Sequence, residues 1–463
     1  MHRHAGKEIE AEQTPKPTGA PALFIDAFAG CGGLSLGLLR AGWQCLFAID
    51  KDSFACDTFK ANLLEGRYRD RFHWPAWLPQ GPTCIEALLS DHGADLAALR
   101  GKVALLAGGP PCQGFSSAGR RDAADPRNDL MRAYLQLVEL LEPDMVLLEN
   151  VKGITLDISR SDATGRPVNY ADLLRASLGG RYDIYSTMAK AMEFGVPQAR
   201  TRFILVALHR RLGFNIGDIA KCIDRARQRF LRRHRLVTPV SALAAISDLE
   251  VTRNGTVPCP DSPGFDSIGY STPRTHYQRI MHDGCAHPPC NTRLAHHSAE
   301  ITNRFSHIIT SCRHAGRLNI SIPQEMRDEL GIKKQAIRVL DPDRPAPTIT
   351  GMPDDLIHYA EPRTLTVREN ARLQGFPDWF SFKGKYTTGG HLRRLQVPRF
   401  TQVANAVPPM MAEVLGNALF EILSKSNTLY KAETPKVGDL VELHINEHGN
   451  IGEIQAMFDK VTA

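Results

Sequence analysis

The chain has 463 residues, of which 43% are apolar and 23% charged, so it can form one large domain and a smaller one, each with a buried core. It contains no run of about 18 apolar residues, and its polar N-terminus lacks the apolar stretch of a secretory signal. We therefore expect a cytoplasmic protein without a membrane segment. Its ten cysteines are scattered, which favours buried side chains and at most one reactive thiol over a disulfide framework.

The net charge of +6 is concentrated in one part of the chain. Between residues 209 and 235, nine Arg and Lys residues face only Asp218 and Asp224. Concentrated positive charge suits a phosphate backbone, whereas a basic run in a helix is more often a solvated face. Composition therefore leaves nucleic acid as one of two open interpretations.

Short apolar runs alternate with helical patterns between Leu23 and Leu208. This rhythm predicts an α/β fold with a mostly parallel sheet, helices on both faces and ligands at the carboxyl ends of the strands. We expect strands at 23–28, 45–50, 103–109 and 144–150, each followed by a helix, at 34–42, 53–64, 130–141 and 170–178 respectively.

The rhythm stops after Leu208. A helical stripe of apolar residues follows over 219–230, and Pro, His and Gly are then frequent to about residue 340, which predicts a second domain of irregular structure. Regular patterning returns at 365–373 and at 403–423, where a helix should follow a proline pair. The polar tail after that segment has a hairpin pattern around residues 440–454.

A glycine-rich turn joins the first predicted strand to its helix. Gly30, Gly32 and Gly33 allow a tight turn and a close approach of the backbone to a ligand, although a plain strand–helix connection would explain them equally well. Asp50 ends the next predicted strand, 20 residues after Gly30. A carboxylate there can accept hydrogen bonds from both ribose hydroxyls of an adenosyl cofactor, which favours a nucleoside cofactor.

Cys112 follows two prolines at the end of the third predicted strand, in the segment GGPPCQGFS. The prolines stiffen the chain and place the thiol at the crevice that the glycine turn faces. The flanking glycines and prolines have no packing rationale, so the pattern favours a nucleophile over a structural thiol. Residues 113–128 are polar and contain glycines, as in a loop that closes over a substrate.

Two further motifs place charged side chains near the same crevice. Glu149 ends the fourth predicted strand, where the ordinary alternative is the capping of a turn. Arg200 and Arg202 alternate in the strand pattern PQARTRFILVA and should project from one face. Two such cations predict an anionic or polar partner, and the alternative is a solvated edge strand.

These motifs together resemble the DNA cytosine-C5 methyltransferase family. FAGCGG, GGPPCQGFS, ENV, PQARTR, LTVRENARLQGFPD and QVANAVPP occur in the family's order over about residues 21–422. The resemblance implies a Rossmann-like S-adenosylmethionine-dependent methyltransferase domain and a smaller target-recognition domain. The expected divisions are a disordered tail at 1–20, a catalytic domain at 21–212 completed by 394–423, target recognition at 213–345, a connecting motif segment at 346–393 and an extension at 424–463.

The resemblance also implies a mechanism. Cys112 would add to C6 of cytosine, and Glu149 in its protonated form would assist at N3. Arg202, together with Arg200, would bind the base O2 and a nearby phosphate or hold the surroundings of Glu149. The target carbon is inaccessible in a stacked duplex, so the base must flip out of the helix.

For the cofactor, S-adenosyl-L-methionine, the resemblance assigns a pocket at the strand ends. The contact to the adenine amino group falls near residues 83–86, where Cys84 and Glu86 are alternative alignments. No metal is expected, because Cys285, His287 and Cys290 lack a paired metal-binding spacing. The residues implied in the cofactor pocket are Phe28, Gly30, Gly33, Asp50, Pro111, Leu130, Asn405 and Val407.

The implied substrate is a specific sequence in double-stranded DNA, and the implied setting is a monomeric prokaryotic modification enzyme, with a cognate restriction endonuclease acting on the same site. One alternative is a tRNA cytosine-C5 methyltransferase, but the Cys-Phe-Thr signature of those relatives is missing from the sequence. Another is a DNA-binding homologue without catalysis, which would have no need of a nucleophile.

Overall fold

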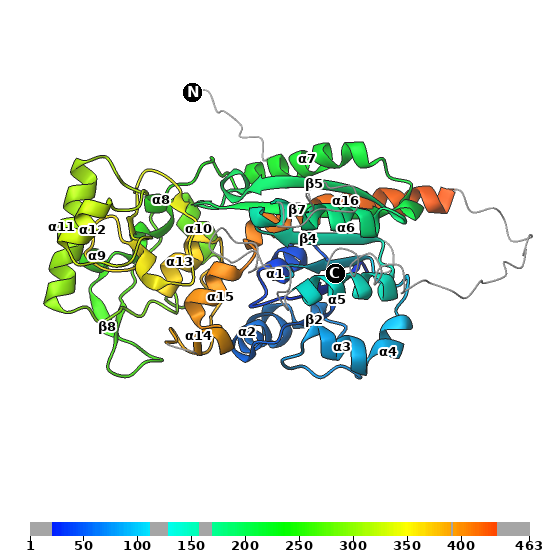
Figure 1. The fold of residues 1–463 in the computed structure, drawn as a ribbon, viewed down its shortest axis with the longest axis horizontal. Helices are drawn as coiled ribbons and strands as arrows, with labels where there is room; N and C mark the ends of the chain where they lie inside the picture. The colour runs from blue at the N-terminus through cyan, green and yellow to red at the C-terminus, as the bar shows by residue number, and fades with distance from the viewer. Residues whose placement is uncertain (1–20, 112–127, 157–168, 390–391, 433–463) are drawn as a thin grey trace, which may run out of the picture.

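The computed structural model describes residues 21–111, 128–156, 169–389 and 392–432. The described chain forms two lobes, one built on a central sheet and one of short helices and loops (Figure 1). The expected tail at 1–20 and the hairpin pattern at 440–454 lie outside the described residues.

The sheet has six strands in the order β2-β1-β3-β4-β7-β5. Neighbouring strands among the first four are parallel, whereas β7 runs antiparallel to both β4 and β5. The prediction of a mostly parallel sheet is confirmed, with one reversed strand, β7, between β4 and β5. The strands are β1 (Leu23–Ala27), β2 (Gln44–Ile49), β3 (Leu105–Gly108), β4 (Met145–Asn150), β5 (Tyr182–Lys190) and β7 (Thr201–His209).

Helices cover both faces of this sheet, because successive strand residues point to opposite sides. In β4, Met145 and Leu147 belong to one buried cluster and Val146 and Leu148 to the other. The first cluster includes α1 (Gly33–Arg40), α7 (Ile219–Arg233) and α16 (Pro409–Ala432). The second includes α3 (Ile85–Asp91), α4 (Gly93–Ala97), α5 (Asn128–Leu141) and α6 (Tyr170–Leu178), while α2 (Ser53–Phe59) continues into a π-helical segment, Lys60–Arg67.

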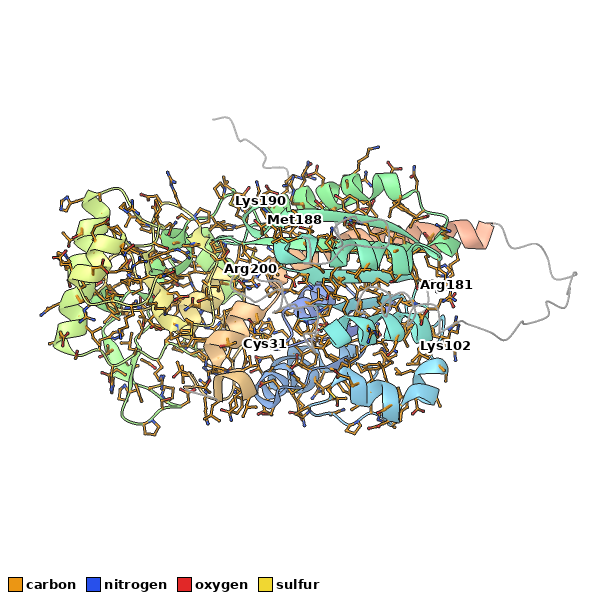
Figure 2. The ribbon with its side chains drawn as sticks, in the orientation of Figure 1. Cys31, Lys102, Arg181, Met188, Lys190 and Arg200 are labelled. Carbon is orange, nitrogen blue, oxygen red and sulfur yellow. The ribbon has the colours of Figure 1, made fainter. Side chains whose placement is uncertain are left out.

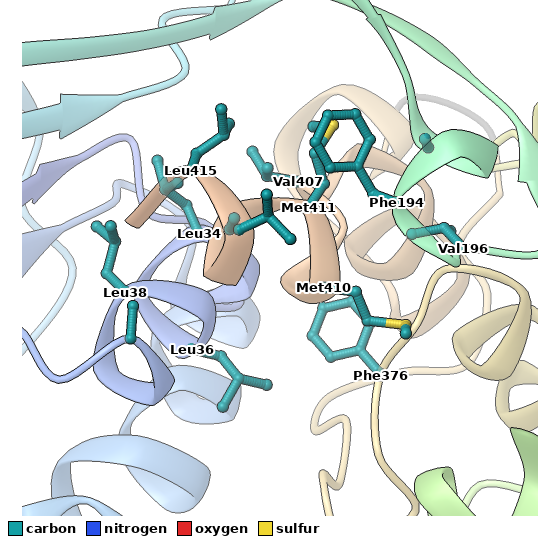
Figure 3. Packing of buried hydrophobic residues seen from close by; sticks show 14 of the residues in the cluster. Leu34, Leu36, Leu38, Phe194, Val196, Phe376, Val407, Met410, Met411 and Leu415 are labelled. Carbon is teal, nitrogen blue, oxygen red and sulfur yellow. The ribbon is translucent and has the colours of Figure 1, made fainter. Parts of the chain in front are cut away.

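Helices α1 and α16, which come from opposite ends of the chain, pack closely together. Leu34 and Leu38 of α1 lie beside Met411 and Leu415 of α16 (Figure 3). The predicted helix after the proline pair is confirmed, and it continues beyond 423 to Ala432. A separate short helix, α15 (Arg399–Asn405), precedes it.

The segment Arg399–Ser426 is long and apolar enough to cross a membrane by composition alone. However, 83% of its most apolar window is buried inside the protein. Its apolar character is therefore accounted for by packing in the core.

The second lobe consists of short elements, as the irregular sequence predicts. Its buried apolar cluster centres on Phe305, Ile308 and Val339. Two small antiparallel strands form a hairpin, β8 (Thr256–Pro258) with β9 (Asp266–Ile268). The other elements are α8 (Ala242–Ile246), α9 (Val251–Asn254), α10 (His276–His282), α11 (Ala299–His314), α12 (Gln324–Glu329), the pair β10 (Arg338–Val339) and β12 (Leu356–Ile357), and α13 (Val367–Leu373).

The basic run of the sequence lies largely in α7, on the sheet lobe. Arg225 and Arg229 form ion pairs with Glu421 of α16, at 3.3 and 2.6 Å, and Arg227 pairs with Asp224 within the helix. The two ion pairs with Glu421 hold α7 on α16. The geometry therefore favours a helix face over a nucleic-acid surface for these arginines.

Candidate active site

Glu149 and Arg202 form a buried ion pair at the end of the sheet. Antiparallel pairing sets the end of β4 beside the start of β7, with Glu149 opposite Ile204. The Nε atom of Arg202 lies 2.8 Å from Oε1 of Glu149, and the two residues are only 9% and 8% exposed. In this geometry the guanidinium and the carboxyl group compensate for part of each other's desolvation.

Arg200 lies in the same region, between the short strand β6 (Gln198–Ala199) and β7 (Figure 2). It is 3% exposed, and its Nε has no hydrogen-bond partner among the described residues. Burial, and then the neighbouring Arg202 charge, lower the pKa of Arg200 to about 9, although Glu149 opposes this change. The edge-strand alternative is wrong, because β7 lies between β4 and β5.

The segment that leads to Cys112 is anchored beside this pair. Nδ2 of Asn150, the residue after Glu149, donates a hydrogen bond of 3.0 Å to the carbonyl of Pro110. A Cβ atom on Gly109 would lie 3.4 Å from Oε2 of Glu149, so the backbone passes close to the carboxylate. This stretch of described residues ends at Pro111. The predicted nucleophile Cys112 and most of the predicted closing loop lie outside the described residues.

Asp50 and the glycine turn meet at the ends of β1 and β2. The backbone N–H of Gly30 donates to Oδ2 of Asp50, and that of Asp52 donates to Oδ1, both at 2.9 Å. Burial raises the pKa of Asp50, and these two hydrogen bonds limit the increase. Gly30 has a φ of +55°, and a Cβ added to it would meet no atom within 4 Å, so the turn faces open space.

Gly33 brings the C-terminal motif to the glycine turn. A Cβ on Gly33 would lie only 2.3 Å from the carbonyl oxygen of Val407, so a side chain there would separate α1 from this segment. Asn405, exposed at the end of α15, lies two residues earlier. Phe28 precedes the turn with a φ of +63°, which is unusual for an aromatic residue and often marks a functional site. Its ring lies 6.5 Å from that of Tyr134.

The remaining predicted cofactor residues come from neighbouring segments. Pro111 follows β3, and the half-buried Leu130 lies in the first turn of α5 and packs against the buried cluster on that face. These two residues do not line the small pocket that includes Gly30 and Asp50. That pocket also contains Trp74, whose position in an irregular segment carried no sequence signal.

The two alternative residues for the contact to the adenine, Cys84 and Glu86, differ in burial. The backbone N–H of Thr83 donates to the carbonyl of Asp50 at 2.8 Å, which brings this segment to the pocket. Cys84 is half-buried and its Sγ caps α3, whereas Glu86 is exposed. Neither residue is among the described residues that line the pocket of Gly30 and Asp50, whereas Gln80 and Gly81 of the preceding segment are. Within the described ranges, no three His, Cys, Asp or Glu side chains are grouped as metal ligands.

Comparison with known proteins decides the family. The family model for C-5 cytosine-specific DNA methylases matches residues 23–421. The chain belongs to this family. It is therefore a DNA cytosine-C5 methyltransferase with a Rossmann-like fold, and its methyl donor is S-adenosylmethionine.

Individual relatives agree over most of the chain. The type II methyltransferases M.DdeI of Desulfomicrobium norvegicum and M1.HphI of Haemophilus parahaemolyticus are each 28% identical to it. The matches cover 86% of this methyltransferase and 88% and 87% of the relatives. A solved structure described as a prophage-encoded DNA modification methyltransferase from E. coli aligns with a TM-score of 0.59 at 25% identity, over 87% of this chain and 99% of that one.

The residues around the glycine turn fit S-adenosylmethionine. Each Asp50 oxygen receives one backbone hydrogen bond and retains a further lone pair for a ribose hydroxyl. The open space beside Gly30 allows close approach of a ligand to the backbone. The methyltransferase thus presents acceptors and space where an adenosyl group requires them.

Proposed function

We propose that this methyltransferase modifies C5 of a flipped cytosine in duplex DNA through a covalent bond between Cys112 and C6. The main support is the hydrogen bond from Asn150 to Pro110, which anchors the segment leading to Cys112 beside the Glu149–Arg202 ion pair. A nucleophile and an acid that act on the same pyrimidine ring must lie close together.

The proposed chemistry divides the work among three side chains. The Cys112 thiolate adds to C6, while Glu149 supplies a proton or hydrogen bond at N3, so that C5 becomes enamine-like. Arg202 donates to the base O2 and holds the Glu149 carboxyl in position. S-adenosylmethionine, when bound, supplies the electrophilic methyl group that C5 receives. Loss of the C5 proton then expels the Cys112 thiolate and leaves 5-methylcytosine.

Binding of the cofactor is assigned to the strand ends and to the C-terminal motif. Asp50 accepts hydrogen bonds from the ribose hydroxyls, and Gly30 allows the backbone to approach the ligand. The hydrophobic side chains hold the adenosyl and methionine parts in place. The full proposed set is Phe28, Gly30, Gly33, Asp50, Pro111, Leu130, Asn405 and Val407.

DNA recognition is assigned to residues 213–345, which include most of the second lobe, and closure over the base to residues 113–128. The catalytic domain comprises 21–212 and 394–423, joined to the second domain by 346–393. Since relatives are type II methyltransferases, we assign the chain to prokaryotic restriction-modification, as a cytoplasmic monomer that protects sites of a cognate endonuclease.

The test is transfer of tritiated methyl from S-adenosylmethionine to unmethylated duplex DNA, with tRNA in parallel. Cys112→Ala should abolish transfer to cytosine C5. Cys285→Ala is the matched control, because this half-buried cysteine lies in the second lobe. Duplex DNA in which 5-fluorocytosine replaces cytosine should trap wild type and Cys285→Ala, but not Cys112→Ala, in a denaturant-resistant complex.

Each result has a distinct meaning. Loss of both transfer and trapping in Cys112→Ala alone supports the covalent mechanism. Methylation retained by Cys112→Ala would overturn the assignment of the nucleophile. Label on tRNA but not on DNA would overturn the proposed substrate.

A further inference from the structure

An open pocket of about 330 Å³ lies where the second lobe meets the C-terminal motifs. Asp261, Ser262 and Arg293 come from the second lobe, around the β8–β9 hairpin. Residues 384–387 and Arg399 come from the segment that contains α14 (Leu392–Leu395) and α15. Among the described residues, the lining is Asp261, Ser262, Arg293, Gly384, Lys385, Tyr386, Thr387 and Arg399.

This pocket joins the two lobes. On the far side of the pocket-lining segment, the N–H of Lys383 donates to Oγ1 of Thr58 in α2, and the N–H of Val397 donates to Oδ2 of Asp52, both at 2.8 Å. Helices α14 and α15 lie between the second lobe and α2 in Figure 1. A ligand in the pocket would therefore touch both lobes at once.

The lining carries an excess of positive charge. The charged side chains among the described lining residues are three cations, Arg293, Lys385 and Arg399, and one carboxylate, Asp261. Asp261 already forms an ion pair with Arg399 and accepts a hydrogen bond of 2.9 Å from the Tyr386 hydroxyl. Asp261 is thus paired with Arg399, and the described lining residues include no second carboxylate for Arg293 or Lys385.

Arg293 is held in place but incompletely hydrogen-bonded. Its guanidinium carbon lies 4.2 Å from the ring centroid of Phe265 and 3.8 Å from that of Tyr386. Its buried Nε has no partner among the described residues, and Nη1 reaches only Ser262 Oγ, at 3.5 Å. Aromatic stacking fixes the guanidinium at the pocket wall, and a buried donor without a partner is costly.

We infer that this pocket binds one phosphate of the DNA backbone, with Arg293 as its principal ligand. A planar guanidinium matches a phosphate with two parallel hydrogen bonds, and the hydroxyls of Ser262 and Thr387 can complete the donor set. Phosphate contacts fix the register of a protein on a duplex without reading its sequence. This inference rests on the proposed action on duplex DNA. The phosphate contact would position the second lobe and the sheet lobe on the same DNA strand.

The experiment measures the affinity of the full chain for a short unmethylated duplex that wild type methylates, over a range of salt concentrations. Arg293→Gln should weaken binding by about tenfold and reduce the slope of log K against log salt by about 1, because one phosphate contact is lost. Arg293→Lys should keep most of the slope. Arg232→Gln, which removes an exposed charge from α7, should bind like wild type.

Methyl transfer and thermal unfolding are measured on the same proteins. Arg293→Gln should raise KM for DNA and leave kcat within about twofold, since uniform binding is lost. An unchanged salt slope in a folded Arg293→Gln variant would overturn the phosphate site even though methylation continued. Failure to find any unmethylated duplex that wild type methylates would instead overturn the proposed function. Equal losses in Arg293→Gln and Arg232→Gln would indicate a general charge effect and also overturn the site.

Discussion

Asp26 is a buried carboxyl group beside the glycine turn. It is the last residue but one of β1 and has no exposed surface, and its Oδ2 accepts a hydrogen bond of 2.6 Å from the Ser35 hydroxyl. Oδ1 has no hydrogen-bond partner among the described residues. Burial raises the pKa of Asp26 to about 7; the Ser35 hydrogen bond opposes this increase, and the Asp50 charge adds to it.

This pKa predicts that the free energy of unfolding depends on pH through Asp26. Between about pH 4 and about pH 7, the folded chain holds a proton that the unfolded chain releases, so stability falls as pH rises through this window. Across this window the free energy of unfolding changes through Asp26 by about 4 kcal/mol in total. Asp26→Asn removes this dependence, so the variant should gain stability relative to wild type from about pH 4 to about pH 8, measured by urea unfolding.

Asp91→Asn is the control for this experiment. Asp91 also accepts a hydrogen bond of 2.6 Å from a serine hydroxyl, that of Ser90, but it is exposed. The stability difference between this variant and wild type should stay nearly constant over the same range. A constant difference for Asp26→Asn as well would contradict the buried, proton-holding carboxyl group.

Sequence alone located the residues that stand at strand ends. Glu149 and Asp50 were predictable because a carboxylate that closes an apolar run must leave the core at the carboxyl edge of the sheet. Arg293 was not predictable as a site residue. Its environment is made by Phe265 and Tyr386, which reach it only through the tertiary fold.

At the scale of elements, the contact between α1 and α16 depends on the absence of side chains. A Cβ on Gly37 would lie 2.3 Å from the Ala412 Cβ and 2.6 Å from the Pro409 carbonyl oxygen. Gly416 approaches α1 in the same way, and its carbonyl accepts a hydrogen bond of 2.9 Å from the Trp43 indole. Small residues allow the two backbones to approach each other.

Gly37→Ala should therefore lower the free energy of unfolding by about 1–3 kcal/mol, because the added methyl group overpacks the contact. Helix propensity alone predicts the opposite, a gain of up to about 1 kcal/mol. Gly93→Ala is the control, since a Cβ there meets no atom within 4 Å; its effect should be small. Denaturant unfolding decides the sign, and a stabilised Gly37→Ala variant would show that the helices can move apart freely.

The predicted helices of the sheet lobe match the structure because each buries one face and repeats apolar residues at the helical period, and the predicted strands match because burial on both faces gives short continuous apolar runs. The antiparallel direction of β7 was not predicted from its composition, since a central strand is apolar whichever way it runs. Helix α15 was missed because its seven residues are too few to show a period.

At the scale of the whole molecule, the motif LTVRENARLQGFPD ties segments of the second lobe together through buried charges. Arg372 of α13 donates to both oxygens of Asp248, at 3.0 and 3.1 Å, and its Nε donates to Asp378 at 2.6 Å. All three side chains are fully buried. Sequence marked this motif as a family feature but could not assign its role, because Asp248 lies far away in the chain.

Opposing effects set the ionisation of Asp378. Burial alone would raise its pKa, but the Arg372 charge, together with hydrogen bonds from His282 and Arg372, lowers it below the ordinary value. A lowered carboxyl pKa contributes stability that is present above the unfolded value near 4 and is lost as pH falls below it. Through Asp378, the network should therefore stabilise the second lobe at neutral pH and lose this contribution in acid.

Arg372→Ala should cost about 3–5 kcal/mol of unfolding free energy at neutral pH, because it leaves two carboxylates buried without their cation. The surface pair Arg304–Glu300, at 2.7 Å, supplies the control, and Arg304→Ala should cost under about 1 kcal/mol. Hydrogen exchange distinguishes local from global effects: amides in α8 and α10 should lose protection in Arg372→Ala before those of β1 and β3. Equal loss of amide protection in both lobes would mean that the network stabilises the molecule as one unit and does not specifically hold the second lobe. A loss of unfolding free energy no larger than that of Arg304→Ala would mean that water enters and solvates the two carboxylates.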